Sequence, residues 1–141
     1  MLLQTVNREI PIARGVLNPA AGSGEQSPPG SGATIVIFDS TANTNGLQFA
    51  TWIPFARLVL SINSSANSGA SGVIIEGSED NGANWDAMQP AQTYLTANGL
   101  TQYDILVTSP QVRLRYTNSA SVLTTWRMSL LGVMGDRSRG S

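Results

Sequence analysis

Val112-Arg113-Leu114-Arg115-Tyr116 is the stretch of sequence that decides the fold, because apolar and charged side chains alternate in it at every second position. Successive side chains of a β-strand point to opposite faces of the sheet. The alternation therefore predicts a half-buried strand with its three apolar side chains in a core. Arg113 and Arg115 are predicted to share the opposite face.

Further runs of the same kind lie on both sides of this stretch. They are short, rich in β-branched or alternating apolar residues, and separated by Gly, Asn, Ser and Pro, which is typical of antiparallel sandwiches and barrels. The predicted strands are Thr34 to Phe38, Leu47 to Ile53, Phe55 to Ile62, Val73 to Gly77, Thr101 to Val107, Gln111 to Thr117 and Leu123 to Val133. No segment has a 3.6-residue apolar stripe of helical length. The sequence predicts an all-β, antiparallel β-sandwich over residues 34–134.

Residues 1–33 have a different composition from the rest of the chain. They contain few large apolar groups and end in a Gly-, Ser- and Pro-rich stretch, which buries too little surface to offset the entropy of ordering it. We expect an extended, flexible N-terminal arm with a reach of roughly 110 Å at about 3.3 Å per residue. Residues 135–141 are predicted to be a C-terminal tail. The apolar anchors of the arm are Val6, Ile10, Ile12, Val16 and Leu17.

The inventory of reactive side chains is narrow. The 141 residues include eight arginines and nine carboxylates, but no lysine, histidine or cysteine. Without cysteine there are no disulfides and no common structural zinc sites, and without histidine, cysteine and lysine the usual bases and nucleophiles are missing. We expect no enzymatic activity and no cofactor. The near-neutral charge disfavours nucleic-acid binding, and no apolar run is long enough to span a membrane.

An acidic cluster surrounds the dipeptide Asn81-Gly82, which is the strongest local turn signal in the chain. The cluster consists of Glu76, Glu79, Asp80 and Asp86. Oxygen-rich loops of this kind hold calcium, but the spacing of an EF-hand loop is missing and a solvated hairpin turn is the simpler interpretation. A carboxylate pair for glycoside hydrolysis, Glu76 with Asp86, is a further hypothesis. The sequence shows no cleft around that pair.

Tryptophan and arginine supply the candidate binding groups. Trp52, Trp85 and Trp126 lie in or beside predicted strands, where core packing is expected more often than an exposed sugar-binding platform. Arg113 and Arg115, with Arg127 if the last strand lies nearby, form either a solvated face or a subunit contact. Arginine is enriched and lysine is depleted in protein interfaces. A chain without lysine therefore favours the subunit contact.

Two segments resemble known proteins. Val73 to Trp85 matches the pattern v-x-v-x-G-S-x-D-x-G-x-N-W, and Gln111 to Asn118 matches x-v-R-v-x-x-x-N. Both patterns recur in bacteriophage virion proteins and in discoidin-like jelly-roll domains. The resemblance extends from Val73 to Val133, about half of the chain. It implies a jelly-roll-like sandwich and says little about function, because one fold hosts many roles.

The resemblance to virion proteins implies a structural role. The chain is similar to capsid decoration (cement) proteins of tailed phages, which implies a place on the capsid surface of the virion. The implied partners are the major capsid protein and further copies of the chain, in a homotrimer. The partner-binding residues predicted on this basis are Val6, Ile10, Ile12, Val16, Leu17, Arg113 and Arg115. The alternative is a glycan-binding module of a phage tail fibre or a secreted bacterial protein.

Overall fold

The computed structural model describes residues 8–42, 55–93 and 95–134. Over these ranges the chain forms strands joined by turns and loops: β1 (Arg8–Val16), β2 (Thr34–Asp39), β3 (Arg57–Ser64), β4 (Ser68–Ser78), β5 (Asp86–Thr93), β6 (Leu100–Leu106), β7 (Gln111–Asn118) and β8 (Trp126–Met134). Sheet A has the order β1-β8-β3-β6, and sheet B has the order β2-β7-β4-β5. The predicted all-β antiparallel sandwich is confirmed. No helix in these ranges is long and apolar enough to cross a membrane.

The strand pairing is that of one long hairpin that has been rolled up. Strand β4 pairs with β5, β3 with β6, β2 with β7 and β1 with β8, all antiparallel. The pairs β3·β8 and β4·β7 then join these layers into two sheets. The tip of the hairpin is the turn after β4, where Asn81 and Gly82 have φ angles of 58° and 89°. An eight-stranded double sheet of this kind is a jelly roll.

The core lies between the two sheets, as the alternation predicts. Val112, Leu114 and Tyr116 of β7 are fully buried, and Trp126 of β8 is 1% exposed. Leu58, Leu60 and Ile62 of β3 and Met128 and Leu130 of β8 are buried with them. Burying apolar surface at roughly 25 cal/mol per Å2 makes this layer the main source of stability. The core prediction for Trp126 is confirmed.

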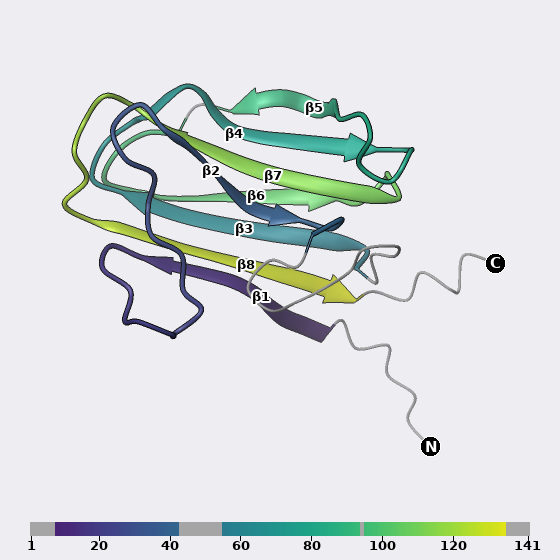
Figure 1. Cartoon of the computed structure of the whole chain (residues 1–141), viewed down its shortest axis with the longest axis horizontal. Coiled ribbons are helices and arrows are strands. Elements are labelled where there is room, and N and C mark those ends of the chain that lie inside the picture. Colours follow the sequence, from purple (N-terminus) through teal and green to yellow (C-terminus); the bar gives the residue numbers. More distant parts are fainter. Residues whose placement is uncertain (1–7, 43–54, 94, 135–141) are drawn as a thin grey trace.

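The main departure from the sequence-based expectation is the N-terminal segment. Residues Arg8–Val16 form the edge strand β1 of sheet A, which lies beside β8 along its whole length (Figure 1). The sandwich therefore begins at Arg8, and the domain boundary predicted at residue 34 is wrong. The physical reason is that Ile12 and Ala13, each 5% exposed, are core residues. They face the core as neighbours at a β-bulge, which breaks the period of two.

Beyond β1, the Gly-, Ser- and Pro-rich stretch is tied to the sandwich by backbone groups. Val16 N–H donates to the carbonyl of Gln26 at 3.1 Å, and Gln26 N–H donates to the carbonyl of Arg14 at 2.8 Å. The side chain of Gln26 also donates to the carbonyl of Ile37 in β2 at 3.0 Å. Asn118 donates to the carbonyls of Pro29 and Gly30. This stretch therefore covers the side of the sandwich where β1 and β2 are the edge strands.

Smaller differences concern strand ends. Strand β4 begins at Ser68 instead of the predicted Val73, and the last strand begins at Trp126 instead of Leu123. Strand β5 has no counterpart among the runs predicted from alternation. The predicted strand Leu47 to Ile53 and Trp52 lie outside the described residues, as do Val6 and the tail 135–141.

Candidate binding site on the outer face of sheet B

The outer face of sheet B carries a cluster of one carboxylate, two guanidinium groups and an indole, formed by Glu76, Arg113, Arg115 and Trp85. We call it the Glu76 cluster. In the register of β4 and β7, Glu76 lies opposite Arg113, and Ile74 lies opposite Arg115. The outward phase of the two arginines, predicted from the alternation in β7, is confirmed. Their common partner was not predicted, because pairing of β4 with β7 cannot be seen in either strand alone.

The two arginines are bound to the same carboxylate. Arg113 Nε donates to Glu76 Oε1 at 2.8 Å. Arg115 makes a two-pronged contact, with Nε donating to Oε1 at 2.9 Å and Nη2 to Oε2 at 3.0 Å. Such charge-assisted, fork-like contacts are among the stronger hydrogen bonds in proteins. They leave the Glu76 side chain only 10% exposed, compared with 23% for Arg113 and 31% for Arg115.

These contacts decide the protonation of Glu76. Burial, the largest single influence, raises its pKa, but the hydrogen bonds and positive charges of Arg113 and Arg115 together outweigh burial. The pKa of Glu76 is therefore lowered. A carboxylate in this state is an acceptor and does not suit the role of a general acid, which needs a raised pKa. The proposed pairing of Glu76 with Asp86 for glycoside hydrolysis thus gains no support from the geometry.

Trp85 covers the cluster from the turn that precedes β5. The guanidinium carbon of Arg113 lies 4.5 Å from the centroid of the Trp85 ring, which is the geometry of a cation–π contact. Trp85 is only partly buried, so the predicted core packing of this residue is wrong. The side chain returns from the hairpin tip onto the outer face of the sheet, where it meets Arg113. The sequence does not show that the hairpin tip after β4 lies close to β7, so the contact between Trp85 and Arg113 could not be predicted from it.

The hairpin tip itself is fixed by polar contacts around Asp80. Asn84 donates to this carboxylate from its backbone N–H at 2.8 Å and from its side chain at 2.6 Å, and the hydroxyl of Ser78 donates at 2.8 Å. The bonds from Asn84, followed by the bond from Ser78, lower the pKa of Asp80 to about 2. Gly82 N–H donates to the Ser78 hydroxyl at 2.9 Å. These contacts fix the turn that leads to Trp85.

The calcium hypothesis does not fit this arrangement. Glu76 faces the arginines of β7, and Asp80 is occupied by Asn84 and Ser78. Among the residues that the structure describes, no group of three His, Cys, Asp or Glu side chains could hold a metal ion. The hairpin-turn interpretation of this acidic stretch is therefore the one that the geometry favours.

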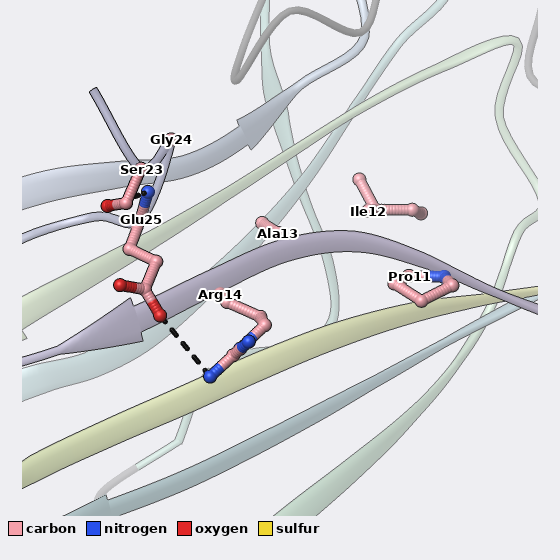
Figure 2. A pocket seen from close by; sticks show the side chains of 7 residues that line it. All are labelled: Pro11, Ile12, Ala13, Arg14, Ser23, Gly24 and Glu25. Carbon is pink, nitrogen blue, oxygen red and sulfur yellow. Dashed lines mark hydrogen bonds and ion pairs between the residues drawn. The ribbon is translucent and has the colours of Figure 1, made fainter. Parts of the chain in front are cut away.

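The predicted arm anchors do not gather at the Glu76 cluster. Ile12 belongs to the core, Leu17 packs against it, Val16 is partly buried, and Ile10 is 36% exposed. A shallow groove of about 520 Å3 lies between β1 and the stretch after it (Figure 2). The groove is crossed by an ion pair between Arg14 and Glu25 at 3.2 Å. The residues that line it are Pro11, Ile12, Ala13, Arg14, Ser23, Gly24 and Glu25.

Comparisons with known proteins give information about the fold of the chain but not about its function. No protein-family model matches the sequence, and no curated protein is similar to it at a significant level. Among solved structures, the chain is similar to PBSX exported protein XepA, with a TM-score of 0.58 and 13% sequence identity over 89% of this chain. The match covers 38% of the XepA chain. This neighbour is a phage-related exported protein, and at such low identity the likeness shows the sandwich fold alone.

Proposed function

We propose that the protein is a structural component of a phage particle, a decoration subunit that binds the capsid surface through the outer face of sheet B. The observation that carries the proposal is the composition of the Glu76 cluster. Tryptophan and arginine are the residue types that dominate binding energy in protein interfaces. Here they lie together on the outer face of sheet B, with Arg113 held between Glu76 and Trp85.

Two further observations support this proposal. Jelly rolls occur in viral capsid proteins as well as in lectins, and one solved structure with a similar fold is a phage-related exported protein. The partners proposed are the major capsid protein and further copies of the chain. The N-terminal segment was predicted to be a flexible partner-binding arm, but in this proposal its residues Arg8–Val16 belong to the folded sandwich. Strand β1 completes the sandwich and supplies Ile12 and Ala13 to the core, so residues 8–16 are proposed as part of the folded domain and not as a free attachment arm.

Attachment can be tested without disturbing the fold. The full chain is added to phage particles purified from the source that encodes it, and bound copies are counted after gradient purification. Replacing Arg113 by Ala removes the stacked guanidinium but leaves the two-pronged contact between Arg115 and Glu76. We expect Arg113→Ala to weaken particle binding at least about tenfold, the effect of about 1.4 kcal/mol.

The matched control is Arg127→Ala, which removes the same side chain from an exposed position on sheet A. This variant should bind particles as the unaltered chain does. No binding by the unaltered chain, or equal loss in both variants, would contradict a decoration role for the outer face of sheet B.

Glycan binding is the second candidate, and the partial exposure of Trp85 favours it. A ring that is not in the core is available to stack on a pyranose, and its removal should leave the fold intact. Trp85→Ala should then abolish binding to a glycan array without a change in the circular dichroism spectrum, whereas Trp85→Phe should keep part of the binding. An array on which the unaltered chain binds no glycan would remove this candidate.

A further inference from the structure

Strand β6 is an edge strand of sheet A with an unusual surface. It pairs with β3, and no other described strand pairs with it on its second side. Leu100 and Leu106, at its two ends, are 64% and 62% exposed. Between them on the same outer face lie Gln102 and Asp104, which are also exposed. An exposed, regular edge strand with apolar side chains is a template for pairing with another chain.

The other edge strands of the sandwich carry features that discourage such pairing. Strand β1 contains Pro11 and a bulge and is covered in part by Gln26. Strand β2 has a bulge between Val36 and Phe38, and β5 contains Pro90 and pairs with β4 through irregular registers. The pairing of β6 with β3 has no register shift, and its sequence, LTQYDIL, has neither proline nor lysine. Among the described edges, β6 is thus the one without a bulge or a proline.

The backbone of β6 shows which groups point away from β3, towards the edge that no described strand covers. Val107, directly after β6, donates its N–H to the carbonyl of Ala56 at 3.0 Å, on the side of β3. Backbone groups alternate in direction along an antiparallel strand. The N–H and C=O groups of Tyr103 and Ile105 therefore also face β3. Those of the even-numbered residues, such as Gln102 and Asp104, face the open edge.

The side chains select one register for self-pairing. If a second β6 lies antiparallel with a two-fold axis at Tyr103, Gln102 of each copy lies opposite Asp104 of the other. Leu100 then lies opposite Leu106. All of these pairs join even-numbered residues, whose free backbone groups can exchange two hydrogen bonds in each pair. Shifting the axis to Gln102 keeps the backbone match but separates the leucines.

We propose that β6 pairs with β6 of a second copy in this register, so that two sheets A become one continuous sheet across a two-fold axis. Each leucine covers the other, and the amide of Gln102 can donate to the carboxylate of Asp104 across the axis. The charge of Asp104 does not oppose the contact, because Arg57 holds it with a hydrogen bond of 2.9 Å from Nε to Oδ1. The contact is a closed dimer, not the trimer that the resemblance implies.

This inference deepens the self-association part of the proposed function, but its test does not depend on particle binding. The full chain is studied by light scattering and sedimentation equilibrium. The proposed contact involves one strand of seven residues from each copy. Such a small interface predicts a dissociation constant for the dimer between about 10 μM and about 1 mM. Leu106→Asp should raise this dissociation constant at least about tenfold. The melting temperature should stay unchanged, since the side chain of Leu106 is exposed in the monomer. The matched control Val122→Asp, at a loop residue that is 83% exposed, should leave the dissociation constant unchanged.

The register is tested with engineered cysteines, since the chain contains none. Chains with Gln102→Cys are mixed with chains carrying Asp104→Cys under mild oxidation. Opposed residues lie within the distance that a disulfide spans, so a mixed disulfide dimer should form in high yield. A mixture of Leu100→Cys and Gln102→Cys, whose positions are not opposed, should give much less. A strict monomer up to about 1 mM, a dimer that Leu106→Asp leaves intact, or equal yields from both mixtures would overturn the proposal.

Discussion

The two edges of sheet A, β1 and β6, show opposite ways of ending a sheet. Strand β1 comes from the stretch of sequence that looked least like part of a domain, but it is held by β8 on one side and partly covered by Gln26 on the other. Strand β6 comes from a regular alternating run, and no described strand pairs with its second side. The comparison shows that irregularity in a sequence can mark a protected edge. A clean alternating pattern can mark an edge that is open to partners.

Among the variants that test the role of β1 and β6, Ile12→Ala is expected to have the largest effect on the free energy of unfolding. Ile12 is a core residue of β1, and removing its side chain leaves a cavity that should lower the free energy of unfolding by about 3 kcal/mol. Ile10→Ala, two residues earlier at a half-exposed site, should cost less than about 1 kcal/mol. Urea unfolding measures both. Equal small effects would mean that β1 contributes nothing to the isolated domain.

The same alanine substitution at a glycine near each edge gives the next largest contrast. A Cβ at Gly15 of β1 would overlap Cζ3 of the buried Trp126 ring, whereas a Cβ at Gly99, just before β6, would meet nothing within 4 Å. Gly15→Ala should therefore destabilise the fold by about 2 kcal/mol or more through overpacking. Gly99→Ala should stay within about 0.5 kcal/mol. Thermal unfolding of the two variants checks the difference.

A smaller effect is expected from the Glu76 cluster. Glu76→Gln leaves Arg113 and Arg115 without their carboxylate and should destabilise the fold by about 1 to 2 kcal/mol at pH 7. Glu79→Gln, in the adjacent exposed turn, should change stability by less than about 0.5 kcal/mol. Because the folded-state pKa of Glu76 is lowered, its contribution is present above the unfolded pKa of about 4.3 and is lost as the pH falls through the folded value. Acid titrations of unfolding should show a shallower decline in Glu76→Gln.

The smallest effect is expected at the hairpin tip. The pKa of Asp80 is lowered to about 2, so its stabilising contribution is present above about pH 3.9 and is lost as the pH falls towards 2. Asp80→Asn should remove this part of the acid dependence and lower the melting temperature slightly. Ser78→Ala takes away one of the hydrogen bonds that lower the pKa of Asp80. The pH at which the contribution of Asp80 is lost should therefore rise in this variant, but the contribution should not disappear as it does in Asp80→Asn. Melting curves between pH 2 and pH 5 measure both.

The interior of the sandwich could be predicted from the sequence because it depends on side-chain direction within single strands. The alternation of Val112, Leu114 and Tyr116 specified a buried face without any knowledge of what lies opposite. The dipeptide Asn81-Gly82 located the hairpin tip in a similarly local way. The fold class followed from these local patterns.

What could not be predicted depends on pairing between distant segments. Strand β1 pairs with β8 at the other end of the chain, and its bulge places Ile12 and Ala13 side by side in the core, which hides the period of two. The Glu76 cluster could not be predicted for the same reason. Glu76 looked like part of an acidic turn until the register of β4 with β7 placed it between Arg113 and Arg115. Trp85 was expected in the core because nothing in the sequence brings the hairpin tip over β7.

Hydrogen exchange of single backbone amides tests the contrast between the two edges of sheet A most directly. In a dilute sample of the full chain, the amides of Val16 and Gln26 should exchange slowly, since each donates to a carbonyl across the β1 edge. The amides of Gln102 and Asp104 should exchange quickly there and slowly in a concentrated sample. Fast exchange of Val16 and Gln26, or protection of Gln102 and Asp104 in the monomer, would contradict the account.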